Sequence, residues 1–239
     1  MDFTFSIRGA LKESWEIFKK HMWFFVALSA VVVVLNFLGS LKNIPFAVSF
    51  ILTVVTFVWS IIFIKISLFA ADGKEDMLSF SKIQSLLPDW KQAFGLLAVG
   101  VLTALLVIGG LVLLIIPGIW IAFRLSLSNI HFIDKGEGIR KSLRASWDMT
   151  KGSVFWTTVL VAIIVGLLYI IGFVLFGIGI LVTYPLALIL AAKFYRAVLA
   201  FHSGEHSVVV QPVEISTAPT HVEEQKEPEH HHEAETPNQ

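Results

Sequence analysis

The segment that decides the fold runs from residue 94 to residue 132 and reads FGLLAVGVLTALLVIGGLVLLIIPGIWIAFRLSLSNIHF. These 39 residues contain one full charge, Arg124. As a single α-helix the segment would be about 58 Å long, whereas the hydrocarbon layer of a membrane is roughly 30 Å thick. The segment therefore predicts two membrane-spanning helices joined by a turn.

Apolar segments continue this pattern toward both ends of the chain. Residues 22–39 and 45–68 each have the length of one span, and residues 154–201 have the length of two. The sequence predicts an all-α, polytopic membrane protein with six transmembrane helices arranged as three hairpins over residues 1–203. The first span is too long for the core of a cleaved signal peptide, so we expect it to remain. The predicted spans are residues 22–39, 45–68, 92–110, 112–133, 154–175 and 179–201.

Glycine and proline indicate where each hairpin turns. Proline is tolerated in the first turn of a helix, where its missing N–H would have no partner in that helix. We therefore predict that the chain reverses just after a glycine and that the proline lies early in the returning helix. The pairs are Gly39 and Pro45, Gly110 and Pro117, and Gly179 and Pro185.

The composition supports a membrane location. Apolar residues make up 56% of the chain and charged residues 15%, whereas a soluble domain carries about 25% charged residues. The net charge of zero combines two unlike parts: residues 1–203 hold 17 Lys/Arg against 10 Asp/Glu, and residues 204–239 hold one Lys against eight Glu. The chain has no cysteine, which excludes disulfides and thiolate metal sites.

Lysine and arginine predict the orientation, because loops on the cytoplasmic side of a membrane are enriched in them. Of the three turns on the opposite side, only the first contains a cation, Lys42. Both termini are therefore predicted to lie in the cytoplasm, with the chain in the cell membrane. The cations on the predicted cytoplasmic side are Arg8, Lys12, Lys19, Lys20, Lys65, Lys74, Lys82, Lys91, Lys135, Arg140, Lys141, Arg144 and Lys151.

An internal repeat precedes the first and third hairpins. LKESWE at residues 11–16 matches LRASWD at residues 143–148 with an offset of 132, and residues 77–91 resemble a weaker third copy. Apolar residues recur at steps of three and four, which predicts an amphipathic interfacial helix before each hairpin. The alternative is an ordinary amphipathic helix packed on the end of the bundle. The residues expected to contact lipid headgroups are Trp15, Lys19, Arg144, Trp147 and Lys151.

Three motifs resemble a bacterial membrane family. LLIIPGIW at residues 113–120, RLSL at residues 124–127 and SLRASWDMTKG at residues 142–152 are similar to the membrane domain of glycerophosphoryl diester phosphodiesterases and to related six-span proteins. The similarity covers residues 85–200 and extends to the N-terminal third through the repeat. In fused members a separate soluble domain performs the hydrolysis, and this chain contains no segment that could form it. The resemblance therefore implies the membrane fold and no enzymatic activity.

Arg124 is the strongest candidate for a site inside the membrane. A cation in the middle of a span costs about 2.5–3.5 kcal/mol on insertion scales. Ser128 and His131 follow at steps of four and seven and would share one helical face, and Lys193 occupies a similar position after Pro185. One interpretation is a polar seam that binds a lipid headgroup or lines a solute path. The other is a structural cation that reaches carbonyl groups or the interface.

The remaining polar residues suggest structural roles. We expect Arg144 to pair with Asp148 four residues later, and a pairing of Glu16 or Asp148 with Lys193 or Arg124 is a second hypothesis. Asp72 and Asp134 each precede a glycine within two residues and are interpreted as turn residues.

The acidic tail, residues 204–239, has the composition of a disordered segment. It could dock a cytoplasmic protein. Its histidines lack the companion ligands of a zinc site, so we predict no metal and no cofactor, and we expect no nucleic-acid partner. These histidines are His206, His221, His230, His231 and His232.

Two classes of function remain open at this point. The first is a non-enzymatic membrane module that organises lipid, including anionic headgroups, or partner proteins. The second is a transporter or permease-like component with a polar site near Arg124, which interrupted spans and repeats would suit. A continuous polar cavity reaching Arg124 would favour transport, and a solid core would favour the first class.

Overall fold

The computed structural model describes residues 3–41, 44–175 and 179–204, and every regular element in these ranges is helical. The elements are α1 (Ile7–Lys20), α2 (Met22–Gly39), α3 (Phe46–Ala71), the 3-10 helices η1 (Glu75–Met77) and η2 (Phe80–Leu86), α4 (Trp90–Leu113), α5 (Ile115–Arg124), α6 (Ser128–Lys135), α7 (Ile139–Met149), α8 (Ser153–Val174) and α9 (Ile180–Ser203).

Six stretches are long and apolar enough to cross a membrane: α2, α3, α4, α5 with α6 (Ile115–Lys135), α8 and α9. Large apolar side chains on these helices are exposed, as shown by Phe46 at 86%, Ile116 at 82% and Phe173 at 74%. Exposed apolar surface on this scale marks contact with lipid or protein rather than with water. The predicted all-α class with six long apolar helices is confirmed, and the chain is a multi-pass membrane protein.

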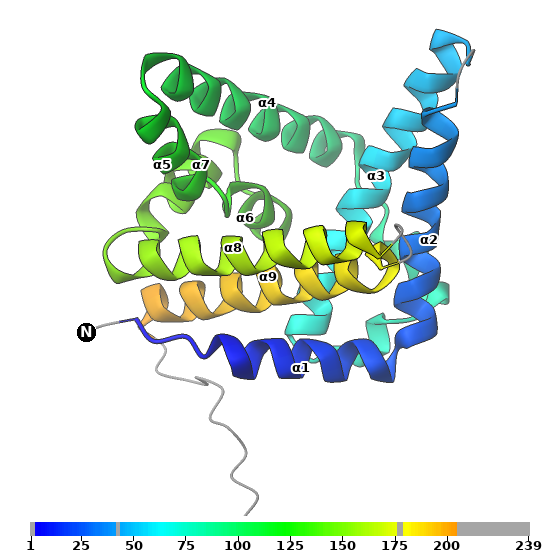
Figure 1. Cartoon of the computed structure of the whole chain (residues 1–239), viewed down its shortest axis with the longest axis horizontal. Helices are drawn as coiled ribbons and strands as arrows, with labels where there is room; N and C mark the ends of the chain where they lie inside the picture. The colour runs from blue at the N-terminus through cyan, green and yellow to red at the C-terminus, as the bar shows by residue number, and fades with distance from the viewer. Residues whose placement is uncertain (1–2, 42–43, 176–178, 205–239) are drawn as a thin grey trace, which may run out of the picture.

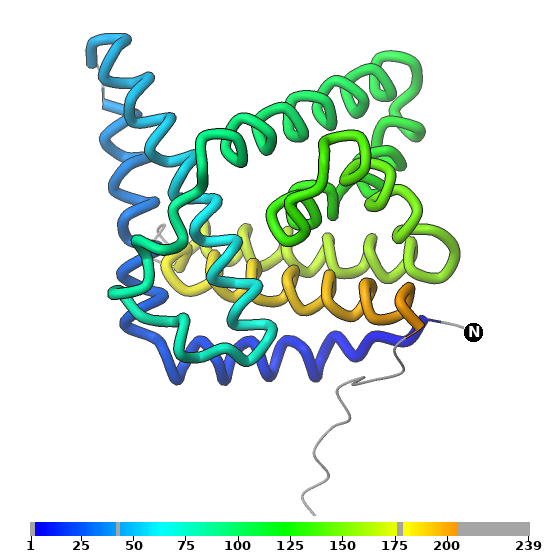
Figure 2. The backbone as a smooth tube through the Cα atoms, turned by 180° about the vertical axis from the view of Figure 1, so that it is seen from behind, coloured from blue at the N-terminus to red at the C-terminus, as the bar shows by residue number. Residues whose placement is uncertain are grey.

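The helices form three antiparallel pairs that run in different directions (Figure 1). The α2–α3 pair stands upright in this view, and its outer part extends beyond the other helices. The α8–α9 pair runs across the lower part of the molecule, and α4 runs along the top before the chain turns into α5. Both views place α1 alongside α9 (Figures 1 and 2).

Helix α9 is the centre of the packing. Half of its most apolar stretch is buried, against 17% in each of α3, α4 and α8. It contacts α1, α2, α3 and α8, and its residues Ile189, Leu190 and Tyr195 are fully buried. The stretches of α3, α4 and α8 therefore bury little of their surface, and that of α9 is the most buried of the six.

Each segment that precedes a hairpin packs on the second helix of another hairpin. The segment η1–η2 lies on α3, α7 lies on α6, and α1 lies on α9. The repeat explains part of this pattern, because Ala10, Ser14 and Phe18 form the buried face of α1 and the buried residues 132 positions later are Ser142, Ser146 and Thr150. Phe18 is buried, whereas Trp15, three residues before it, is 41% exposed.

The predicted interfacial helix before the second hairpin does not form. Its residues adopt the two 3-10 helices η1 and η2 instead. Pro88 disfavours helical backbone at the residue before it, and Leu87 is extended with φ −54° and ψ 130°. Serine side chains also compete for local backbone groups, since the Ser85 hydroxyl donates to the Lys82 carbonyl oxygen at 2.7 Å.

Two of the three predicted turns are misplaced. The first is correct, because α2 ends at Gly39 and α3 begins after Pro45. In the second hairpin α4 continues past Gly110 to Leu113, and Leu114 makes the turn. In the third, α8 ends at Val174 and Gly179 caps the start of α9, so the chain has reversed before Gly179.

Gly110 serves helix packing rather than the turn. A Cβ atom added at Gly110 would lie 2.8 Å from the Cα of Gly118, and one added at Gly118 would lie 2.5 Å from the backbone nitrogen of Leu111. These distances are shorter than atoms tolerate, so α4 and α5 approach as closely as they do only because both residues lack side chains.

We predict that Gly110→Ala lowers the free energy of unfolding by about 1–3 kcal/mol, the usual cost of an extra methyl group in a packed contact. Gly109→Ala is the matched control, because a Cβ atom there would meet nothing within 4 Å. The control should be neutral or stabilise by up to about 1 kcal/mol. Thermal unfolding of the detergent-purified chain measures both, and equal midpoints for the two variants would contradict the close α4–α5 contact.

Candidate functional site

Arg124, the last residue of α5, is enclosed by two tryptophans. Its guanidinium carbon lies 5.1 Å from the ring centre of Trp120 and 4.8 Å from that of Trp147, and the two rings meet edge to face at 5.0 Å. Arg124 also donates a hydrogen bond to the carbonyl oxygen of Thr150. Aromatic faces attract cations, most strongly where water is excluded, and Arg124 is 6% exposed. The buried charge is therefore stabilised from within the chain.

The backbone carbonyl of Arg124 is also bound by α7. The hydroxyl of Ser146 donates to it at 2.9 Å. The hydroxyl of Thr150 lies 3.0 Å from it and also lies 2.7 Å from the Ser146 carbonyl oxygen. Leu125, Ser126 and Leu127 form a turn between α5 and α6, so the predicted fourth span, residues 112–133, is interrupted rather than continuous. Side chains that take over a helical carbonyl bend or break a helix, and here Ser146 comes from the repeat motif before the third hairpin.

The break removes the predicted polar seam. Arg124 faces α7, whereas the Ser128 hydroxyl lies 3.4 Å from that of Thr103 in α4 and donates to the Leu125 carbonyl oxygen at 2.7 Å. His131 faces α9, where its Nδ1 lies 3.1 Å from the Tyr195 hydroxyl. The break therefore separates Arg124 from Ser128 and His131, and those two residues, three positions apart in α6, contact α4 and α9.

Lys193 forms an ion pair with α1. Its Nζ lies 2.5 Å from Oε2 of Glu13, and the two side chains are 14% and 31% exposed. The hypothesis that Glu16 or Asp148 would pair with Lys193 is wrong. The partner is Glu13, which lies about one turn before Glu16 in α1. Lys193 fastens α1 to α9 and is a structural cation in this arrangement.

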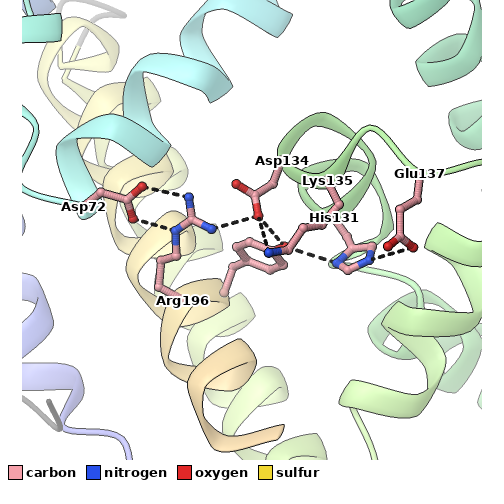
Figure 3. A network of polar contacts seen from close by, with 7 residues as sticks. Asp72, His131, Asp134, Lys135, Glu137 and Arg196 are labelled. Carbon is pink, nitrogen blue, oxygen red and sulfur yellow. Dashed lines mark hydrogen bonds and ion pairs between the residues drawn. The ribbon is translucent and has the colours of Figure 1, made fainter. Parts of the chain in front are cut away.

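A second polar cluster joins three helices (Figure 3). Arg196 of α9 donates two hydrogen bonds to the Asp72 carboxylate, at 2.6 and 2.8 Å, and a third to Asp134 of α6 at 2.8 Å. The Tyr195 hydroxyl donates to Asp134 at 2.9 Å, which leaves its oxygen to accept from Nδ1 of His131. Glu137 and Lys135 lie at the margin of the cluster, 3.8 Å from His131 Nε2 and from Asp134 respectively.

Sequence reasoning missed this cluster. Asp72 and Asp134 were interpreted as turn residues, and Arg196 was given no role. A signal was present, because an arginine within the apolar stretch of a predicted last span needs a partner. The sequence alone could not indicate which of several distant carboxylates would supply it.

The predicted headgroup-contacting residues divide into two groups. Trp15 and Lys19 on α1, Arg144 on α7 and Lys151 just after α7 are exposed, as an interfacial role requires. Trp147 instead turns inward against Arg124. One Asp148 carboxylate oxygen lies 2.5 Å from Lys151 Nζ and the other lies 3.8 Å from Arg144 Nε, so Lys151 is the closer partner of Asp148.

The described residues contain no group of three His, Asp or Glu side chains that could hold a metal ion. The histidines of the tail lie outside the described residues. Two open pockets occur in the described ranges, with volumes of about 400 and 380 Å³, and both are lined mainly by apolar side chains. Arg124 lines neither of them.

We predict that Arg124→Lys destabilises the fold even though it keeps the charge. A lysine ammonium lacks the planar face that stacks on both tryptophans and cannot donate in the same geometry. The expected loss is about 2–4 kcal/mol, from the cation–π contacts and the charged hydrogen bond together. Thermal unfolding in detergent measures it, with the exposed Arg140→Lys as the control, and an unchanged midpoint for Arg124→Lys would contradict the structural role.

We predict that the hydrogen bond from Lys151, helped by nearby cations, holds the pKa of the Asp148 carboxyl below its usual value. Lys151→Gln should raise this pKa more than the control Arg144→Gln does, because Lys151 supplies the larger effect. Since the pKa is lowered on folding, the ion pair stabilises the fold above the pKa of the unfolded chain, and this contribution is lost as pH falls through the lowered pKa. Titration of the Asp148 side-chain carbons by NMR measures the pKa in each variant. A larger rise of this pKa in Arg144→Gln than in Lys151→Gln would contradict the prediction.

Comparison with known proteins adds no assignment. No family model matches the sequence. No curated protein matches it. No solved structure matches it. The function proposed below therefore rests on the contacts within this chain.

Proposed function

We propose that this chain is a non-enzymatic membrane module that gathers anionic lipid headgroups at its basic surface and organises lipid or partner proteins there. The observation that carries the proposal is the separation of its cations into two sets. Arg124, Lys193 and Arg196 are bound by internal partners. The second set consists of exposed cations without ion-pair partners in the described ranges, and these can attract anionic lipid headgroups.

Five of the exposed cations lie on the two repeat helices. No ion pair involves Arg8, Lys12 or Lys19 on α1, or Arg140 or Lys141 on α7, anywhere in the described part of the chain, and all five are exposed. Each cation near a membrane surface contributes about 1 kcal/mol of attraction to anionic lipid. Several unpaired cations on one helix therefore favour enrichment of anionic lipid around it.

Tryptophans support an interfacial position for the start of each hairpin. Trp23, Trp90 and Trp156 occupy the first turn of α2, α4 and α8 and are 79%, 69% and 73% exposed. Tryptophan concentrates at the boundary between headgroups and acyl chains. All three also lie within five residues of a lysine, which is the combination that an anionic interface attracts.

The core around Arg124 argues against a solute path. Two tryptophans and Thr150 occupy the space around the guanidinium, and Arg124 lines neither of the two open pockets described above. We also propose that both termini face the cytoplasm of the cell and that the tail, residues 204–239, reaches a cytoplasmic partner.

One observation favours the transporter alternative. Glu137, His131, Tyr195 and Asp134 form a chain of titratable groups that leads from an exposed side chain to the half-buried Arg196. Such chains carry protons in some pumps and transporters. Proton-driven uptake of a solute into sealed vesicles containing the purified chain would favour this alternative over a lipid-organising role.

Lipid selectivity of the reconstituted chain tests the proposal. Tryptophan fluorescence is measured in vesicles that contain brominated acyl chains on either phosphatidylglycerol or phosphatidylcholine at the same mole fraction. We expect stronger quenching by the brominated anionic lipid, and we expect the difference to shrink at about 1 M salt, where the screening length falls to roughly 3 Å. Equal quenching by the two lipids at low salt would sink the proposal.

A further inference from the structure

An open groove of about 400 Å³ lies between α4, α5 and α7. Its lining combines aliphatic side chains from all three helices with the edge of Trp147 and with two arginines of α7. This volume falls within the range of small-ligand sites, roughly 300–1,000 Å³. The lining residues include Leu106, Ile121, Leu143, Arg140, Arg144 and Trp147.

The two arginines carry positive charge that the described chain does not neutralise. Arg140 has no ion-pair partner in the described ranges, and Arg144 approaches Asp148 only to 3.8 Å. Asp148 is held more closely by Lys151, at 2.5 Å. Arg140 and Arg144 are four residues apart in α7 and therefore lie on the same face of that helix. Their side chains line the groove almost entirely through apolar atoms, so the two guanidinium groups lie at the margin of an apolar groove.

The position of this charge requires an anionic partner. Leu106, which lines the groove, lies sixteen residues after Trp90 in α4, and the stretch between Lys91 and Leu113 contains no charged side chain. Arg140 and Arg144 thus lie beside the apolar part of a candidate span. Acyl chains do not solvate a guanidinium, so a groove bordered by two of them favours a ligand that combines a negative group with an apolar part.

We propose that the groove binds one anionic phospholipid, with its phosphate between Arg140 and Arg144 and an acyl chain on Leu106, Ile121 and Leu143. Arginine donates pairs of parallel hydrogen bonds to phosphate oxygens, which suits a phosphodiester headgroup. The aliphatic floor distinguishes this ligand from a free phosphate. The inference rests on the proposed function and adds a single defined site to a general enrichment of anionic lipid.

Trp147 connects the groove to the core. One side of its ring contacts Arg124, and the same residue lines the groove. A lipid in the groove would therefore cover the outer side of the Trp120–Trp147–Arg124 contact and exclude water from it. Occupancy of the groove should strengthen the attachment of α7 to α5.

The test counts lipids bound to the full chain in detergent by native mass spectrometry, with phosphatidylglycerol added in increasing amounts. The variant is Arg140→Gln with Arg144→Gln, and the control is Arg8→Gln with Lys12→Gln, which removes the same charge from exposed positions on α1. Because each cation contributes roughly a fivefold effect, we expect the groove variant to weaken the first binding step by roughly 30-fold. The control should weaken it by less than about twofold, because no groove residue changes.

A second variant tests the apolar floor without changing charge. Leu106→Trp fills the groove and should also weaken the first binding step, while a monodisperse elution profile confirms that the chain is folded. Glycerol phosphate serves as a soluble competitor. If it displaces the lipid at equal concentration, the site recognises phosphate alone and the phospholipid assignment is overturned.

The outcomes separate this inference from the proposed function. Equal losses in the groove variant and the α1 control would overturn the single site, while the vesicle quenching experiment would still show anionic enrichment. Equal binding of phosphatidylglycerol and phosphatidylcholine by the unmodified chain would overturn the inference as well. The proposed function fails together with this inference only if the vesicle experiment also shows no preference for the anionic lipid.

Discussion

The fold depends on the ion contacts of Arg196. This residue of α9 binds Asp72 at the end of α3 and Asp134 in α6, so one side chain joins the second helices of all three hairpins. Ion pairs removed from water gain stability only with close geometry and further hydrogen bonds, and Tyr195 supplies one of these to Asp134. Apolar side chains of α3, α4, α6, α8 and α9 form a shared core, and the guanidinium of Arg196 adds contacts of fixed geometry among the three second helices.

Three further cations connect each hairpin to the segment that precedes another hairpin. The second helix of each hairpin carries one cation that binds the segment preceding the next hairpin: Lys65 donates to the Leu86 carbonyl oxygen, Arg124 contacts α7, and Lys193 pairs with Glu13 of α1. The last contact closes the series, because α1 precedes the first hairpin and packs on the third. A repeat unit that cannot bury its own polar and apolar faces gains stability from its siblings in this way.

The sequence predicted what depends on length and local pattern. Six apolar stretches, the helices α1 and α7, and the equivalence of Ser14 with Ser146 all follow from residues close together in the chain. The break between α5 and α6 could not be predicted, because it arises when the hydroxyl of Ser146 takes the Arg124 carbonyl from more than twenty residues away. Trp147 was assigned to the interface for the same reason: its real partner, Arg124, is distant in sequence.

These contacts explain why a buried cation here is weak evidence of a binding site. A charge placed within an apolar span needs a partner, and the chain provides one for Lys65, Arg124, Lys193 and Arg196 alike. The discriminating feature is instead a cation that lies beside an apolar span and lacks such a partner. Arg140 meets this condition within the described ranges, and Arg144 nearly does because Lys151 holds Asp148 more closely. Binding of an anionic ligand should therefore occur on the face of α7 that carries Arg140 and Arg144, because these arginines are not neutralised by close partners inside the chain.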